Sequence, residues 1–210
     1  MPVHAKICGV STADAVDASI AGGAKWLGFN FFPASPRYVD PARAAALIRR
    51  VPAHIGSVAV LVDPDDALVD HVLGAGITAL QLHGTETPER VAALRRHGVP
   101  LWKVIAVRTR ADLEQATRYR GVADRILYDA KTPRGALPGG MGLRFDWRLL
   151  EGFRHPLPWA LSGGLDADNV AEAAGVTGAP LVDVSSGVES APGVKDVDKI
   201  AAFLQATAQL

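Results

Sequence analysis

Short runs of apolar and β-branched residues alternate along the chain with longer, alanine-rich stretches whose apolar residues recur at helical spacing. The short runs are continuously apolar, which is typical of parallel strands that are buried on both faces. This pattern predicts eight strands, over residues 5–8, 26–31, 57–62, 79–82, 102–107, 125–128, 159–161 and 181–184. It predicts helices between them, over residues 13–21, 41–50, 64–75, 88–97, 111–119, 145–150, 167–174 and 197–207.

Alternation of strands with helices indicates βαβ units and a parallel sheet. The 210 residues provide about 26 residues for each of eight units, near the short end for a closed (β/α)8 barrel. We therefore predict an α/β fold, a single TIM barrel domain over residues 1–210 with parallel strands. A doubly wound open sheet is the alternative fold, because alternation alone does not show that the sheet closes.

Charge and apolar content exclude several classes of partner. The 22 basic and 22 acidic side chains give a formal net charge of zero, so no overall field attracts nucleic acid or an anionic membrane. The apolar runs are shorter than the roughly 18 residues that a membrane span needs, and residues 1–6 do not resemble a signal peptide. We expect a cytoplasmic protein. Cys8 is the only cysteine, which excludes an internal disulfide and a cysteine zinc site.

Two segments rich in glycine and serine follow the last two predicted strands, LSGGL at 161–165 and VDVSSGVE at 182–189. Glycine lets a backbone approach an anion closely, serine adds hydroxyl donors, and a following helix presents its positive N-terminal end. In eight-stranded barrels a phosphate site is commonly formed by the loops after strands 7 and 8. The two segments therefore predict one phosphate site.

Polar residues gather at the ends of the other predicted strands, where a barrel fold has its active site. They are Lys6, Cys8, Asn30, Arg37, Asp63, Gln81, His83, Arg108, Asp129 and Asp183. Each has a structural interpretation as well: Cys8 as a small core residue, Asp63 as a helix cap or turn former, and Arg37 as a solvated charge. Gln81 and His83 are equally well explained as partners of loop backbone. The functional interpretation is favoured because these residues converge at one end of the fold together with a phosphate site.

Seven segments, in order along the whole chain, carry a family resemblance. They are residues 6–9 (KICG), 28–38 (GFNFFPASPRY), 81–84 (QLHG), 127–130 (LYDA), 139–147 (GGMGLRFDW), 161–165 (LSGGL) and 183–189 (DVSSGVE). Together they resemble the phosphoribosylanthranilate isomerase family of tryptophan biosynthesis. One departure is Met141, where the family often has threonine, so the glycine-rich loop lacks a hydroxyl.

The resemblance implies an Amadori rearrangement of N-(5-phosphoribosyl)anthranilate to 1-(2-carboxyphenylamino)-1-deoxyribulose 5-phosphate, with no cofactor and no metal. It implies that Asp129 is the general acid and Cys8 the general base, and that Arg37 pairs with the anthranilate carboxylate. Two further substrate contacts, His83 and Asp183, follow from the same pattern. Backbone amides are expected to hold the phosphate at Gly163, Gly164, Ser186 and Gly187.

General acid-base chemistry places demands on the two catalytic groups. Asp129 has to hold a proton at neutral pH, and Cys8 has to lose its proton more readily than a free thiol does. Lys6, two residues before Cys8, is a candidate stabiliser of the thiolate.

Two other functions stay open at this point. One is a different phosphosugar barrel enzyme, such as the related isomerase of histidine biosynthesis or an indole-forming lyase. The histidine enzyme ordinarily has aspartate at the position of Cys8 and two similar half-barrels, and no internal repeat is visible here. The other is a non-catalytic module that binds a phosphorylated ligand, since fold does not fix function. The expected partner is a small molecule, and the protein is expected to be a monomer or a homodimer.

Overall fold

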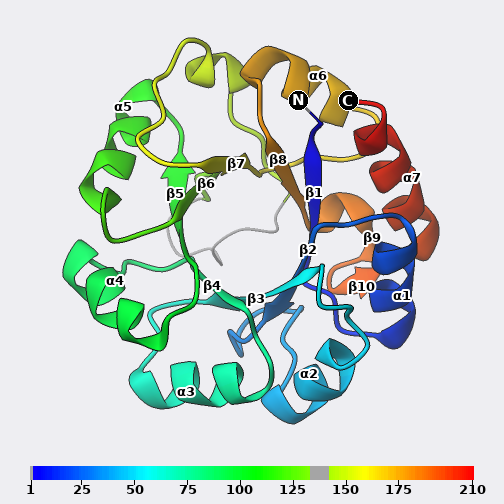
Figure 1. Ribbon diagram of the computed structural model, residues 1–210. Helices are drawn as coiled ribbons and strands as arrows, with labels where there is room; N and C mark the ends of the chain where they lie inside the picture. The colour runs from blue at the N-terminus through cyan, green and yellow to red at the C-terminus, as the bar shows by residue number, and fades with distance from the viewer. Residues whose placement is uncertain (1, 133–141) are drawn as a thin grey trace.

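Parallel strands close into a barrel in the computed structural model, which describes residues 2–132 and 142–210. In the described chain the barrel strands are β1 (His4–Cys8), β2 (Trp26–Asn30), β3 (Gly56–Leu61), β4 (Ala79–Leu82), β5 (Leu101–Val107), β6 (Arg125–Ala130), β7 (Trp159–Leu161) and β8 (Leu181–Val184). Each strand pairs with the next, and β8 pairs back with β1 (Figure 1). The predicted barrel is therefore confirmed, and the open sheet is wrong.

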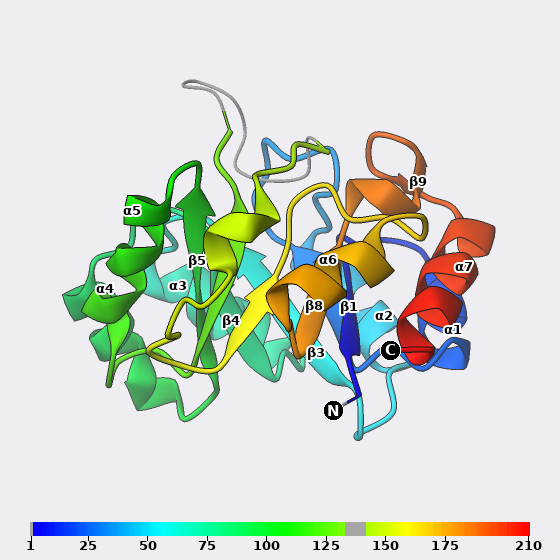
Figure 2. The same ribbon diagram turned by 90° about the horizontal axis from the view of Figure 1, so that it is seen from above.

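Helices form a ring outside the strands (Figures 1 and 2). They are α1 (Ala13–Ala21), α2 (Pro41–Ile48), α3 (Asp66–Gly74), α4 (Pro88–Leu94), α5 (Arg110–Leu113), α6 (Val170–Thr177) and α7 (Val197–Ala208). Single 3₁₀ segments follow or replace helices at η1 (Arg95–His97), η2 (Glu114–Tyr119), η3 (Trp147–Leu150) and η4 (Ser186–Val188). The helices predicted at 111–119 and 145–150 are thus largely 3₁₀.

Capping residues determine where several helices begin. Asp40 and Thr87 precede a proline at the first helical position, and their side chains accept the backbone N–H three residues on. The helix predicted from residue 64 instead begins at Asp66, because the side chain of Asp65 accepts the N–H of Leu68. Local capping chemistry therefore explains both the correct and the shifted boundaries.

A two-stranded antiparallel ribbon, β9 (Glu189–Ala191) and β10 (Val194–Lys195), lies between β8 and α7 and was not predicted. Gly193 at its turn has φ +82°, and a Cβ there would lie 2.3 Å from the backbone oxygen of Pro36. Only glycine permits both this φ and this close approach. The ribbon consequently packs against the loop after β2.

Side chains inside the barrel form an apolar cluster separate from the main core between strands and helices. Its members are Val58, Ala79, Trp102, Val104, Leu127, Ala160 and Leu181, with Trp26 packed against them. Successive side chains of a strand point to opposite faces, so these inward residues alternate with outward ones such as Leu80 and Ile126. We call this cluster the barrel floor. In Figure 2 the βα loops and β9 lie at the opposite, upper end of the strands.

Candidate active site

Polar side chains form a second inward layer directly above the barrel floor. Gln81, Asp129, Ser162 and Asp183 each stand two residues after a floor residue of the same strand and therefore point inward as well. All four are buried. Together with Cys8 at the end of β1, they make the barrel interior polar at the carboxyl ends of the strands, where barrel enzymes have their active sites.

A small chamber of about 40 Å³ lies within this layer. It brings together five of the residues proposed from the sequence: Cys8, Arg37, His83, Asp129 and Asp183. A larger cavity of about 620 Å³ shares Arg37 and His83 with the chamber and extends along the loops after β7 and β8. Its lining includes three of the predicted phosphate-binding residues, Gly164, Ser186 and Gly187. The predicted catalytic and phosphate-binding residues therefore surround connected space.

A buried ion pair between Lys6 and Asp183 lies next to Cys8. The Nζ of Lys6 lies 2.7 Å from Oδ1 of Asp183, whose Oδ2 accepts a hydrogen bond of 3.1 Å from the hydroxyl of Ser162. Burial alone lowers the pKa of Lys6, but the charge of Asp183 and then that of Cys8 outweigh it and raise this pKa above its ordinary value. Lys6 thus remains an ammonium beside the thiol.

Burial raises the pKa of Cys8 above its ordinary value, and the nearby ammonium of Lys6 opposes this effect only in part. The expectation that Cys8 loses its proton more readily than a free thiol is therefore wrong. Lys6 does act in the predicted direction, but the cost of placing a thiolate inside the barrel is larger. A thiolate formed here is a stronger base than a free one and represents a smaller fraction of molecules at neutral pH.

Gly28 of β2 keeps the space beside this pair open. A Cβ at Gly28 would lie 2.9 Å from Sγ of Cys8 and 3.0 Å from Nζ of Lys6. Any side chain there would push the thiol and the ammonium from their positions. The glycine therefore permits the contact between Lys6 and Cys8.

Asp129 occupies the opposite side of the chamber, near the end of β6. Its Oδ1 accepts the N–H of Ala130 at 2.8 Å, and its Oδ2 lies 3.4 Å from Nε2 of His83. Gly163, with φ +94°, lets the loop after β7 lie against this carboxylate, since a Cβ there would be 3.1 Å from Oδ1. Two βα loops therefore border the carboxylate of Asp129.

Arg37 is buried against the ribbon, which rules out the interpretation of a solvated charge. Its Nε and Nη2 each donate a hydrogen bond of 2.7 Å to the carboxylate of Glu189. Lys195 adds a bond of 2.8 Å to the same carboxylate and one of 2.8 Å to the backbone oxygen of Ser185. The guanidinium is therefore held in a bidentate geometry at the edge of the chamber.

The charges of this cluster influence one another. Burial raises the pKa of Glu189, but the hydrogen bond from Arg37 and the charge of Lys195 outweigh burial and leave the pKa below its ordinary value. Burial lowers the pKa of Lys195 despite the attraction of Glu189. With all three groups ionised, two cations share one carboxylate, and the cluster carries one net positive charge. It is suited to an anionic ligand group.

Sequence reasoning did not identify Glu189 and Lys195 as site residues. Glu189 stands 152 positions from Arg37 in the chain, so their pairing depends on the ribbon and on barrel closure. The available signal was that Glu189 is the last residue of the second glycine and serine segment.

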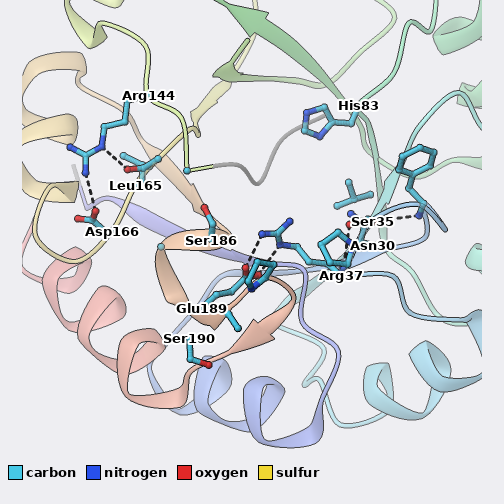
Figure 3. Close-up of a pocket in the computed structure, with 18 of the residues that line it drawn as sticks. Asn30, Ser35, Arg37, His83, Arg144, Leu165, Asp166, Ser186, Glu189 and Ser190 are labelled. Atoms are coloured by element: carbon cyan, nitrogen blue, oxygen red, sulfur yellow. Dashed lines mark hydrogen bonds and ion pairs between the residues drawn. The ribbon is translucent and has the colours of Figure 1, made fainter. Parts of the chain in front are cut away.

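Arg144 holds the loop after β7 through hydrogen bonds, and it was not predicted from the sequence as a site residue. Its Nε donates to the backbone oxygen of Gly164 at 3.0 Å, and its Nη2 donates to Asp166 at 3.0 Å. The side chain of Asn169 donates to the same oxygen of Gly164 at 3.0 Å. In Figure 3 the pair of Arg144 and Asp166 lies on one side of Ser186, and the pair of Arg37 and Glu189 lies on the other, with His83 beyond.

The predicted helix N-terminus at the phosphate segments is only partly present. After β7, α6 does not begin until Val170, and after β8 the chain forms only the short η4. Backbone geometry is more favourable than helix position: Gly163 and Gly164 both have positive φ, at +94° and +65°. Met141 lies outside the described residues.

Two further residues at strand ends, Asp63 and Arg108, form local hydrogen bonds. Asp63 has φ +44° and accepts the backbone N–H of Thr85 at 2.7 Å, so it is a turn former that joins two loops. It is not a helix cap, a role that belongs to Asp65. Arg108 is exposed, and its backbone N–H donates to Asp112 at 3.0 Å.

Neither a metal-binding cluster nor a membrane-spanning helix is present in the part of the chain that the structure describes. Within residues 2–132 and 142–210, no three or more histidine, cysteine, aspartate or glutamate side chains are grouped so as to hold a metal ion. Within the same ranges, no helix has the length and apolar content needed to cross a bilayer.

Comparison with known proteins covers nearly the whole chain. A family model described as N-(5'-phosphoribosyl)anthranilate (PRA) isomerase matches residues 5–206. The N-(5'-phosphoribosyl)anthranilate isomerase of Zymomonas mobilis subsp. pomaceae is 59% identical over 208 residues, 98% of each chain. That of Paramagnetospirillum magneticum is 54% identical over 209 residues, 98% of this chain and 97% of the other.

Solved structures agree with the sequence comparison. Phosphoribosyl anthranilate isomerase from Thermotoga maritima superimposes with a TM-score of 0.89 and 35% identity, covering 99% of this chain and 100% of the other. A phosphoribosyl anthranilate isomerase in complex with reduced 1-(o-carboxyphenylamino)-1-deoxyribulose 5-phosphate gives a TM-score of 0.86 with 33% identity, over 99% of this chain and 100% of the other.

Proposed function

The chain belongs to the N-(5'-phosphoribosyl)anthranilate isomerase family, and from this premise we propose that Cys8 and Asp129 are its general base and general acid. The enzyme is an aldose-ketose isomerase of tryptophan biosynthesis that converts N-(5-phosphoribosyl)anthranilate to 1-(2-carboxyphenylamino)-1-deoxyribulose 5-phosphate. The observation that carries our proposal is that both side chains line the same small chamber.

The reaction depends on a proton transfer to the ring oxygen and another from C2. Asp129 donates a proton to the ring oxygen of the ribose, and the ring opens as the anthranilate nitrogen forms an iminium with C1. The thiolate of Cys8 then removes the proton from C2 and forms the enolamine, which becomes the ketone as C1 takes up a proton and the C2 hydroxyl loses its own. A general acid and a general base in one chamber are sufficient for these steps, and no cofactor is part of the proposal.

Lys6 supports the base in this scheme. Its ammonium, held by Asp183, faces Cys8 and favours the thiolate when C2 is to be deprotonated. The hydrogen bonds of Asp183 to Lys6 and Ser162 support a positioning role for this carboxylate, in addition to the direct substrate contact proposed from the family pattern.

Substrate recognition divides between the two ends of the molecule. We assign the anthranilate carboxylate to Arg37, whose guanidinium Glu189 orients. We assign the phosphate to the backbone amides of Gly163, Gly164, Ser186 and Gly187, because glycine conformation and loop position favour close approach there. The proposed contact of His83 is supported by its place in both cavities.

Three broader features belong to the same proposal: one barrel domain over residues 1–210, a cytoplasmic location, and a monomeric or homodimeric state. A related structure from Thermotoga maritima is described as mutually generated monomers of a dimeric enzyme, which supports the dimer. Gel filtration with light scattering measures the mass directly. A mass at neither one nor two times 22.1 kDa would contradict this part of the proposal.

The proposal is tested by supplying freshly made N-(5-phosphoribosyl)anthranilate and following the decay of its anthranilate-type fluorescence. Purified enzyme should accelerate the decay, and the Cys8→Ser and Asp129→Asn variants should not. Retention of full activity in both variants would assign the proton transfers to other residues.

A further inference from the structure

One buried polar atom in the chamber has no hydrogen-bond partner among the described residues: Oε1 of Gln81. Gln81 is 1% exposed. Other amide and hydroxyl groups of the chamber do have partners: Asn30 accepts the N–H of Phe32 at 2.9 Å, and Ser162 donates to Asp183 at 3.1 Å. Ser35 accepts the N–H of Arg37 at 3.2 Å. Gln81 thus differs from these neighbours in having a buried oxygen without a hydrogen-bond partner.

The position of Gln81 explains why the protein itself does not satisfy this oxygen. Gln81 points into the barrel from β4, above Ala79, and its partners in register on the adjacent strands are Val60 and Trp102. Val60 has no polar side-chain atom, and Trp102 belongs to the apolar barrel floor. Rotation of the amide by 180° exchanges its oxygen and nitrogen, but it places a polar atom at the same point.

Buried polar groups without partners are costly and rare, so each one calls for a physical reason. Here the oxygen lines the same chamber as Cys8 and Asp129, into which the reacting carbons must come. A ligand that donates a hydrogen bond at this point would remove the cost. The orphaned acceptor therefore indicates a donor on the substrate.

We propose that Oε1 of Gln81 accepts a hydrogen bond from the C3 hydroxyl of the substrate's sugar, which makes Gln81 a substrate-binding and specificity-determining residue. This inference rests on the proposed function of the chamber. C3 is bonded to C2, one of the two reacting carbons, and its hydroxyl keeps its proton throughout the reaction. The C2 hydroxyl loses its proton to form the ketone, so it cannot donate the same bond from substrate to product.

The bond has a consequence for specificity. A site that contains a buried acceptor for a hydroxyl strongly rejects analogues that lack this hydroxyl, because the acceptor then stays unpaired. Gln81 should therefore discriminate against sugars deoxygenated at C3, while the phosphate loops and Arg37 recognise the two ends of the molecule.

Gln81→Leu tests the inference, because leucine nearly retains the shape and removes both polar atoms. The free variant should melt a few degrees higher than wild type, because the cost of burying an unpaired polar group disappears. Its affinity for the reduced product analogue should fall about 10-fold to 100-fold in calorimetry. Its affinity for inorganic phosphate, which reaches only the far loops, should stay within about twofold.

Thr207→Val is the matched control. Thr207 is equally buried, but its hydroxyl donates to the backbone oxygen of Phe203 at 2.8 Å on α7, away from the chamber. This variant should melt at or slightly below the wild-type temperature and bind the product analogue normally. The opposite signs of the two melting shifts separate an orphaned acceptor from a satisfied one.

The outcomes are distinct. Unchanged affinity of Gln81→Leu for the product analogue would overturn the inference, and so would equal losses for product analogue and phosphate, which indicate a folding effect. Weakened binding of the product analogue alone, together with full activity of Cys8→Ser and Asp129→Asn, would preserve the role of Gln81 and contradict the proposed acid and base.

Discussion

The barrel floor and the polar layer above it come from the same strands, and their residues stand two positions apart along the chain. The two layers nevertheless have different roles. Four floor residues, Ala79, Leu127, Ala160 and Leu181, are at most 2% exposed. The residues above them, Gln81, Asp129, Ser162 and Asp183, are at most 8% exposed. Exposure to solvent therefore hardly separates the two layers.

The difference lies in what surrounds each layer. Floor residues form one apolar cluster, with the guanidinium of Arg125 over the ring of Trp102, and they stabilise the barrel by burial and packing. In the polar layer, Asp183 contacts the ammonium of Lys6, and Asp129 accepts the backbone N–H of Ala130 at the end of β6. Changes in the floor should therefore alter stability, and changes in the polar layer should alter chemistry.

Asp129→Asn should produce the largest effect on chemistry. The amide keeps the shape of the side chain but cannot supply a proton, so kcat should fall about 100-fold to 10,000-fold. The free energy of unfolding and the affinity for the reduced product analogue should change little. Steady-state kinetics with calorimetry measures all three quantities, and more than about half of wild-type activity would remove Asp129 from the role of acid.

Trp102→Ala should show the opposite behaviour in the floor. Trp102 is 2% exposed and packs edge-on against Trp26 at 5.0 Å between ring centroids, so its removal should cost about 3–5 kcal/mol of unfolding free energy. Urea denaturation measures this loss. Activity per folded molecule should stay within about threefold of wild type. A well-folded variant that has lost catalysis would break the division between the two layers.

Arg37→Ala tests the rim of the polar layer and should have an intermediate effect. Loss of a charged hydrogen bond should weaken binding of the reduced product analogue by about 1.5–3 kcal/mol, and inorganic phosphate should bind almost as before. The variant should also be less stable, because Glu189 then keeps only Lys195 as a charged partner. Calorimetry with both ligands distinguishes the cases: equal weakening of both would indicate a general effect of charge or folding.

The smallest effect concerns a titratable group outside both layers. Burial lowers the pKa of His155, which stacks on Trp159 at 4.0 Å, from 6.5 to about 4. The unfolded chain therefore takes up this proton first, and stability should decline as pH falls from about 6.5 to about 4. Melting temperature followed over this range should decline less steeply in His155→Phe than in wild type. Identical slopes would show that other groups control acid stability.

The sequence was sufficient to predict the strands that carry the floor. Continuous apolar runs predicted the barrel, and β4 and β7 begin and end where the pattern placed them. It also predicted that Cys8, Arg37 and Asp129 lie close together, because strand ends in a closed barrel converge at one mouth. Their roles, which the family resemblance implies, stay predictions.

What the sequence could not predict depends on contacts between distant segments. The bond between Arg37 and Glu189 requires the ribbon of β9 and β10, for which a five-residue pattern gives no clear signal. The raised pKa of Cys8 depends on a balance between burial and the charge of Lys6, and only the folded structure shows which is larger. Similarly, the missing partner of Gln81 reflects the apolar neighbours that barrel pairing places beside it.

The central claim, that the polar layer moves protons while the floor holds the fold, is tested most directly by the single-turnover rate of Cys8→Ser. Serine preserves the size of the side chain but has a hydroxyl of much higher pKa, so it cannot take the proton from C2. We predict a rate at least about 100-fold below wild type, with unfolding free energy and product-analogue affinity nearly unchanged. A Cys8→Ser enzyme that turns over as fast as wild type would contradict the account.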